Sequence, residues 1–332
     1  MLSLIPLVLL LAFVWACGGG SGGNPTAEPV PPSPEEAGLD APQGRGLFIF
    51  GRPKEPIAGG EYILGANPQI LWAEVEPQEG VYDWGKLDAA IDEAEANGTK
   101  IVPRILTNAS LFAQATPDWF FESADAQSYF PSAQAEAEGF KAPIAWDPVF
   151  QRKFGSFLRA LGQRYDGNPA IEFFQTNAGG GLYGEIVIAV NPEYFPPEWT
   201  PDVQRNAIFY WIDRWQESFP RTELSLMVNH VGNDIGEDAA GYAATRGLYL
   251  QQNTPWLPAE GVALFIAHQD ETKIVMEVED GCRSTSEADF DNLIETVFGY
   301  GFAIDYLHLC GDGLSQEGTA TRLRAVVQRL RE

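Results

Sequence analysis

Carboxylates at the ends of apolar runs are the residues in this chain best placed to do chemistry. Glu277 and Glu279 lie in the apolar run KIVMEVE, and Glu185 ends the glycine-rich segment NAGGGLYGE. A protonated carboxyl group can assist a leaving oxygen while an ionised one attacks a carbon, and such a pair can cleave a glycosidic bond. Because Glu279 follows Glu277 by two residues, both face the same side of a strand, and Glu279 is the alternative to Glu277.

Further polar and aromatic residues follow apolar runs or lie in the segments between them. Arg104 could orient a carboxylate or a sugar hydroxyl, or it could form a structural ion pair with Glu74 or Glu76. The flat faces of tryptophans could stack on sugar rings, and His230 and His308 could contact a hydroxyl group or serve the fold. The expected ligand contacts are Trp72, Arg104, Trp119, Trp146, Asn177, Asn229, His230, Trp256 and His308.

Metal and nucleotide sites have no support in the sequence. The three histidines are scattered, and none has a second histidine four residues away, as a zinc site on a helix would need. No glycine-rich phosphate-binding motif follows an expected strand. We therefore expect no metal ion and no cofactor.

Apolar runs alternate with amphipathic ones along the chain. Asn97 and Gly98 are expected to stop the first long helix, because both residues adopt the left-handed conformation readily. Expected strands are Gly44–Gly51, a run from Ile70, Thr99–Leu106, Ala170–Thr176, Glu223–His230, Gly247–Asn253, Lys273–Glu279 and Ala303–Leu309. Expected helices are Gly85–Asn97, Phe150–Tyr165, Asp202–Phe219, Asp238–Arg246, Pro258–Gln269, Asp289–Tyr300 and Ala320–Leu330.

Eight strands that alternate with helices predict an α/β fold, the (β/α)8 TIM barrel, over residues 44–332. A strand that follows a crossover helix lies parallel to the strand before it, and about 250 residues or slightly more suit one such barrel. The active site of a barrel lies at the carboxyl ends of its strands, where the candidate residues fall. The long segment 106–148 between the third strand and the next helix is expected to be functional.

The segment that follows Ile70 resembles a known family. It matches the second βα unit of the clan of retaining glycoside hydrolases built on the eightfold barrel, through Glu76, Pro77, Gly80, Tyr82, Asp83 and Trp84. The run MEVEDG is similar to the seventh-strand motif of barrel β-galactosidases, in which a glycine follows the nucleophilic glutamate by four residues. The resemblance therefore implies that Glu277 is the nucleophile.

The acid/base residue departs from the clan's pattern. In most of the clan the fourth strand ends in Asn-Glu, whereas Ala178 follows Asn177 here. The segment that ends at Glu185 is similar to the Gly-x-x-Gly-Glu segment that carries the acid in barrel β-amylases, which are inverting enzymes. The resemblance thus implies a hydrolase of a neutral glycan, with Glu185 as acid/base and retention expected. The alternatives are a barrel that has lost catalysis and binds glycans at the cell surface, and an inverting hydrolase or transglycosidase.

The amino-terminal residues are typical of export. Residues 1–17 contain a short apolar run and end in VWAC, which resembles the lipobox of bacterial lipoproteins and implies lipid attachment at Cys17. An uncleaved anchor or a misplaced start is the alternative. Residues 18–43 are rich in Gly, Pro and acidic groups and predict a flexible tether. We expect a lipid-anchored protein of the bacterial cell envelope, in which Cys282 and Cys310 could form a disulfide.

The net charge limits the partners. The chain has 46 acidic and 21 basic residues, which gives a formal charge of −25. Such a field repels nucleic-acid phosphates and anionic lipid headgroups, so we expect no nucleic-acid partner and a neutral ligand.

Overall fold

The computed structural model describes residues 45–50, 59–109, 112–178, 181, 184–189, 191–228, 234–253, 256–278, 287–310 and 319–332. The predicted segments 1–17 and 18–43 lie outside these ranges. Residues 39–332 form one compact unit. Within the ranges that the structure describes, no helix is long and apolar enough to cross a membrane.

The central sheet is a closed (β/α)8 barrel. Its strands pair in the order β3-β5-β8-β9-β10-β11-β12-β1-β2-β4, and all of these pairs are parallel. Only one residue separates β2 from β3, and only two separate β4 from β5, so each pair is one strand in two segments and the ends of the order meet. The strands are β1 Gly46–Phe50, β2 Ile63–Asn67, β3 Gln69–Leu71, β4 Lys100–Ile101, β5 Arg104–Leu106, β8 Phe174–Gln175, β9 Leu224–Met227, β10 Tyr249–Gln252, β11 Ile274–Val278 and β12 Tyr306–Cys310.

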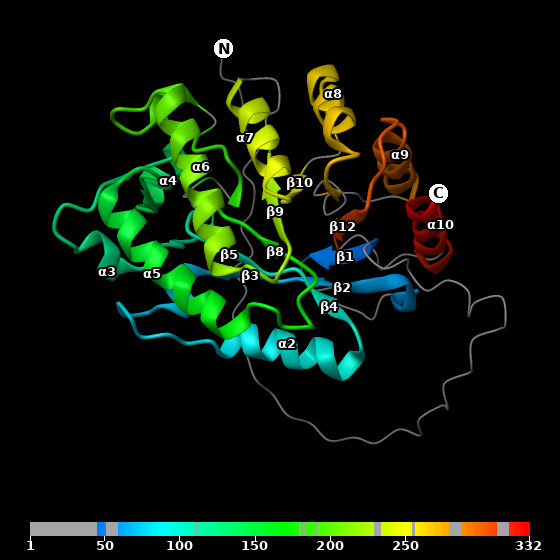
Figure 1. Cartoon of the computed structure of the whole chain (residues 1–332), viewed down its shortest axis with the longest axis horizontal. Coiled ribbons are helices and arrows are strands. Elements are labelled where there is room, and N and C mark those ends of the chain that lie inside the picture. Colours follow the sequence, from blue (N-terminus) through cyan, green and yellow to red (C-terminus); the bar gives the residue numbers. More distant parts are fainter. Residues whose placement is uncertain are drawn as a thin grey trace, which may run out of the picture. The chain divides into compact units, whose positions relative to one another are not determined.

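Helices follow the strands and cover the outside of the barrel, with α5, α6 and α7 side by side (Figure 1). They are α1 Trp72–Val75, α2 Gly85–Asn97, α3 Asp118–Phe121, α4 Ala133–Glu138, α5 Pro148–Tyr165, α6 Pro201–Ser218, α7 Asp234–Thr245, α8 Ala259–His268, α9 Glu287–Phe298 and α10 Thr319–Arg331. The long segment after β5 also contains a small antiparallel pair, β6 Ser128–Tyr129 and β7 Ala142–Pro143.

The helix ends confirm the local signals in the sequence. Gly98 follows α2 with a φ of 65°, which is the left-handed conformation that glycine adopts without strain. The side chain of Asp147 accepts hydrogen bonds from the first backbone N–H groups of α5, and Thr200 does the same for α6. Each of these two helices has a proline in its first turn, where no backbone donor is needed.

One expected element is different. The run from Ile70 was expected to be a strand, but Trp72–Val75 forms the short helix α1. The strand lies earlier, in β2 and β3, and residues 63–67 were not expected to contribute to it. The reason is that Trp72 and Val75 turn outward and join the core between the sheet and the helices, so the apolar run reflects burial and not a continuing strand.

The inside of the barrel is built in two layers, because inward positions recur every second residue along a strand. The lower layer, here called the aromatic floor, consists of Phe48, Val102, Phe173, Tyr249, Val275 and Tyr306. Two residues after five of these floor residues lie buried polar side chains, and β2 and β9 contribute two more; this layer above is here called the polar layer. It consists of Asn67, Arg104, Gln175, Ser225, Gln251, Glu277 and His308.

Candidate active site

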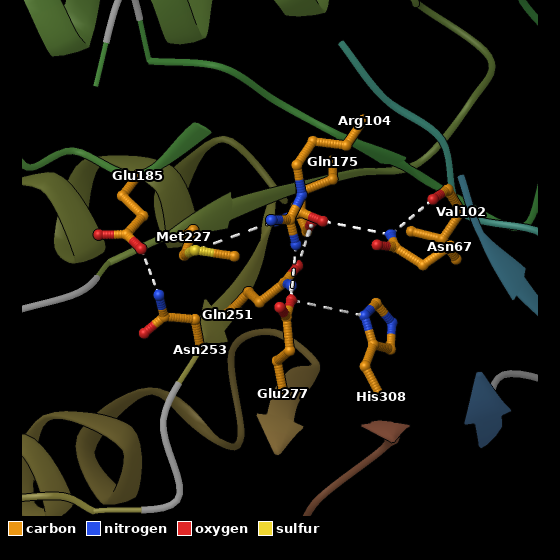
Figure 2. A network of polar contacts seen from close by, with 11 residues as sticks. Asn67, Val102, Arg104, Gln175, Glu185, Met227, Gln251, Asn253, Glu277 and His308 are labelled. Atoms are coloured by element: carbon orange, nitrogen blue, oxygen red, sulfur yellow. Dashed lines mark hydrogen bonds and ion pairs between the residues drawn. The ribbon is translucent and has the colours of Figure 1, made fainter. Parts of the chain in front are cut away.

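Glu277 lies at the centre of the polar layer. It belongs to β11, and its carboxyl group points into the barrel, where the residue is 3% exposed. Nη2 of Arg104 on β5 donates to Glu277 Oε2 over 2.5 Å, and Nε2 of Gln251 on β10 donates to the same oxygen over 3.2 Å (Figure 2). Two donors from two other strands therefore hold this carboxylate, and one of them carries the opposite charge.

The partner of Arg104 decides whether this residue orients a carboxylate of the site or forms a structural ion pair with Glu74 or Glu76. Glu74 forms an ion pair with Lys86, and Glu76 accepts hydrogen bonds from the indole of Trp72 and the backbone of Gly80. Burial raises the pKa of Glu76. The ion pair expected with Glu74 or Glu76 is therefore wrong, and Arg104 instead orients the carboxylate of the predicted nucleophile.

Gln251 was not among the residues expected from the sequence. It is fully buried, and Ser225 Oγ on β9 donates to its Oε1 over 2.9 Å. The signal that could have found it is the period of the strand, since Gln251 lies two residues before Asn253 and therefore shares its inward face.

Glu185 returns to the barrel from the segment after β8. Its backbone forms a parallel bridge with Met227 of β9, and its carboxyl group accepts a hydrogen bond from Nδ2 of Asn253 (Figure 2). A Cβ atom at Gly181 would lie 1.5 Å from the carbonyl oxygen of Glu185, so only glycine fits at this close approach. Gly181, a glycine of this run that the structure describes, therefore lies directly against the backbone of Glu185.

Asn177 has a role in the fold. Its amide nitrogen donates to Thr107 Oγ1 over 2.6 Å, and its backbone carbonyl accepts from the indole of Trp215 on α6 over 2.9 Å. Asn177 is fully buried, and its expected contact with a ligand stays a prediction. Ala178 is part of the core between the sheet and the helices, which leaves Glu185 as the carboxylate that the fourth βα segment brings to this site.

His308 lies beside Glu277, its register partner on β11. Its ring packs on Phe48 and Phe173 of the aromatic floor, with Nδ1 4.0 Å from Glu277 Oε2. Burial, with a smaller contribution from the charge of Arg104, lowers the pKa of His308 to about 3. The imidazole is therefore neutral near pH 7 and fully buried, and its expected contact with a hydroxyl group stays a prediction.

The tryptophans separate into buried and exposed ones. Trp72 was expected to contact ligand, but it is fully buried against aromatic side chains such as Phe154 and Trp119, at ring distances of 5.1 and 5.4 Å. Trp119 donates to the backbone of Glu76 over 2.8 Å and is partly buried outside the barrel. Both contribute to the helical layer, since α1 and α3 carry them there.

Trp146 is partly buried, whereas Trp256 is exposed. Trp146 packs against the small cluster of Tyr129 and Ile188, and Phe195, which packs on the same cluster, lines a hollow of about 340 Å³. Trp256 is 57% exposed just after β10. The expected sugar contacts of both tryptophans stay predictions.

Several predicted residues lie outside the described residues. They are Cys17, Asn229, His230, Glu279 and Cys282. Cys310 is the buried last residue of β12, and its pairing with Cys282 stays a prediction. Among the described residues, no group of three His, Cys, Asp or Glu side chains could hold a metal ion.

Comparison with known proteins shows which family part of this chain resembles. Residues 68–183 match the family model of β-galactosidase, glycoside hydrolase family 42, and this range contains Arg104, Asn177 and the run from Glu76 to Trp84. Over these residues the chain is similar to that family. No curated protein matches the sequence.

Solved structures support the barrel fold of this chain. An exo-β-1,4-mannosidase from Opitutaceae bacterium strain TAV5 superposes with a TM-score of 0.55 at 13% identity, over 87% of this chain and 60% of the mannosidase. Xylanase 10B from Thermotoga maritima superposes with a TM-score of 0.50 at 10% identity, over 86% of this chain and 96% of the xylanase. The chain thus spans less than two thirds of the mannosidase and nearly all of the xylanase.

Proposed function

We propose that the chain hydrolyses O-glycosidic bonds of a neutral glycan, with Glu277 as nucleophile and Glu185 as acid/base. The observation that carries the proposal is the setting of Glu277, a buried carboxylate at the seventh strand of a barrel, held by a guanidinium and an amide on one oxygen. Glu185 supports it, because the fourth βα segment brings a second carboxyl group to the inward face of β10.

The reaction then has two steps. Glu277 attacks the anomeric carbon while the protonated carboxyl group of Glu185 gives its proton to the leaving oxygen, which forms a covalent glycosyl–enzyme and releases the first product. Glu185, now ionised, takes a proton from water, and the water oxygen displaces Glu277 from the anomeric carbon. Two displacements at one carbon retain its configuration.

The acidic composition supports a neutral substrate. With a formal charge of −25, the protein repels polyanionic glycans at long range, and this repulsion is screened by salt. We expect neutral oligosaccharides and aryl glycosides to be hydrolysed in preference to uronic-acid or sulfated glycans.

The test is sugar release from a broad panel of glycans and aryl glycosides by the wild type, Glu277→Gln and Glu185→Gln. Glu93→Gln is the matched control, because Glu93 is an exposed carboxylate on α2, outside the barrel. We expect activity in the wild type and control, and a loss of about 10³-fold or more in both variants. Activity that survives both substitutions would contradict the assignment and direct attention to Glu279.

The configuration of the first product separates retention from inversion. Proton NMR of the anomeric signal, recorded within the first minutes of hydrolysis, should show the configuration of the substrate. The opposite anomer would establish the inverting alternative, in which the two carboxyl groups are farther apart, by about 6.5 to 9.5 Å.

A specific observation favours a second function. Ala178 occupies the position of the clan's usual acid and is buried in the core, so this barrel lacks the standard acid/base residue. A protein that binds glycans without cleaving them would fit this loss. Isothermal titration with the panel would show it, as binding by the wild type with no sugar released.

We also propose that the mature protein is tethered to the bacterial cell envelope by lipid at Cys17 and carries a Cys282–Cys310 disulfide. Cys17→Ser should move the protein from the membrane fraction to the soluble fraction. Mass spectrometry of a non-reduced digest should show one peptide that joins Cys282 to Cys310, and two alkylated free thiols there would contradict the pairing.

A further inference from the structure

Hydrogen bonds connect three buried side chains on the neighbouring strands β9, β10 and β11. Ser225 Oγ donates to Gln251 Oε1 over 2.9 Å, and Gln251 Nε2 donates to Glu277 Oε2 over 3.2 Å. Ser225 and Gln251 are fully buried and Glu277 is 3% exposed. Their contacts are therefore made away from bulk water, where a hydrogen bond to a charged group is strong.

The carboxylate determines which way the amide points, and the serine holds it there. An amide side chain presents an acceptor oxygen on one side and two N–H donors on the other, whereas an ionised carboxylate only accepts. The NH2 group of Gln251 therefore faces Glu277, and the hydroxyl of Ser225 holds Oε1 on the other side by donating to it. The reversed amide would place its oxygen against the carboxylate, and the two oxygens would repel each other.

Both donors to Glu277 bind the same oxygen. Nη2 of Arg104 and Nε2 of Gln251 each contact Oε2, the first from β5 across the barrel and the second from the neighbouring strand β10. Neither contacts Oε1. A carboxylate fixed through one oxygen presents the other in a defined direction, which is what attack on an anomeric carbon requires.

The strand β10 also reaches the second carboxyl group. Asn253, which lies two residues after Gln251 and on the same face, donates to Glu185 (Figure 2). Two residues along a strand correspond to about 7 Å. One strand thus contacts both carboxyl groups of the proposed pair, each through a neutral amide.

We propose that Gln251 is a positioning residue for the nucleophile Glu277 and that Ser225 fixes the orientation of its amide. The inference rests on the proposed function. Gln251 touches no reacting atom and acts through Glu277, so its contribution should vanish when Glu277 is replaced by a nucleophile from solution.

Azide rescue of a Glu277→Gly variant provides this replacement. Azide enters the space of the missing carboxylate, attacks the anomeric carbon and leaves as a glycosyl azide product. We would measure Gln251→Leu, which keeps the volume and removes the amide, in the wild-type background and in Glu277→Gly with azide. Gln175→Leu is the matched control, because Gln175 is an equally buried amide of the polar layer whose contacts are with Asn67 and Met227.

The expected result is a difference between the two backgrounds. Gln251→Leu should lower kcat/KM roughly 10- to 100-fold when Glu277 is present, as the loss of a hydrogen bond to a charged group predicts. It should change the azide-dependent rate by less than about threefold. Gln175→Leu, in contrast, should have the same effect in both backgrounds, because its contribution does not pass through Glu277.

Ser225→Ala gives a second, milder test in case Gln251→Leu does not fold. It leaves the amide in place and removes only the donor that orients it, so kcat/KM should fall roughly threefold to tenfold, again only with Glu277 present.

The proposal is overturned if Gln251→Leu keeps wild-type kcat/KM, or if its effect persists at full size in the azide-rescued background. A wild type that releases no sugar would instead overturn the proposed function, and the inference with it. The wild-type measurement therefore distinguishes the two failures.

Discussion

The aromatic floor and the polar layer occupy successive inward positions of the same strands, but they differ in what they contribute. Val275 of the floor precedes Glu277 by two residues, and Tyr249 precedes Gln251 in the same way. The floor consists of rings and aliphatic groups that pack on one another, for example Phe173 and Tyr306 with centroids 5.0 Å apart. The polar layer buries charges and amides, which is costly unless each is paired.

The difference indicates that the aromatic floor mainly stabilises the fold, whereas the polar layer, two residues further along the strands, mainly positions the groups of the proposed reaction. Filling the lower half of a barrel with large apolar side chains stabilises the fold through burial and dispersion. Burying an anion and a cation in the upper half costs part of that stability, and their ion pair fixes the geometry of one carboxylate. Substitutions in each layer should therefore differ in whether they change stability, activity or both.

The largest expected effect comes from breaking the ion pair of the polar layer. Arg104→Met leaves Glu277 buried beside an apolar side chain, and unfolding free energy should fall by about 3–5 kcal/mol while glycan hydrolysis is lost. Urea unfolding followed by fluorescence would measure it. The double variant Arg104→Met/Glu277→Leu should recover most of this stability without any activity, and a double variant as unstable as the single one would contradict the division between layers.

Breaking the aromatic floor should change stability almost alone. Phe173→Ala removes a fully buried ring that packs on Tyr249 and Tyr306, and we expect a loss of about 3–5 kcal/mol from the cavity that remains. The kcat of the folded fraction should stay within about threefold of the wild type. A much larger fall in kcat, measured well below the unfolding temperature, would show that the floor also positions Glu277.

His308 joins the two layers and should make stability depend on pH. Its folded-state pKa, about 3, is far below the usual 6.5, so the unfolded chain binds a proton that the folded chain does not. The contribution of His308 to the free energy of unfolding is fully present above pH 6.5, and it is lost as the pH falls from there toward 3. Between pH 7.5 and 5.5, the wild type should lose about 1 kcal/mol more unfolding free energy than His308→Phe. Parallel curves for the two proteins would show that His308 is not the cause.

The smallest effect is expected at the rim of the floor. The hydroxyl of Tyr306 donates to Glu172 Oε1 over 2.6 Å at the amino end of the barrel, where Glu172 is only partly buried. Tyr306→Phe keeps the ring in the floor and removes this bond, so unfolding free energy should fall by about 1 kcal/mol. A loss comparable to that of Phe173→Ala would mean that polar contacts, and not ring packing, hold the floor together.

Much of the architecture could be predicted from the sequence because it follows from local signals. The period of apolar residues placed α2, α5 and α6 within a few residues of their observed bounds, since capping and burial patterns act over a few turns. The resemblance of MEVEDG to a seventh-strand motif also predicted the strand that carries Glu277, which is β11. The position of Trp72 was not predictable in this way, because an apolar run has the same composition whether it lies in a strand or in the core outside it.

What the sequence by itself determined is therefore the order of strands and helices, the barrel that this order implies, and the strand that carries Glu277. Only the tertiary structure decided which side chains meet. Arg104 contacts a carboxylate 173 residues away in place of Glu74 or Glu76 nearby. Ser225 and Gln251 each contact the residue two positions beyond their register partner on the next strand. The physical reason is that sequence spacing fixes the face on which a residue lies, whereas its partners depend on the register and closure of the whole sheet.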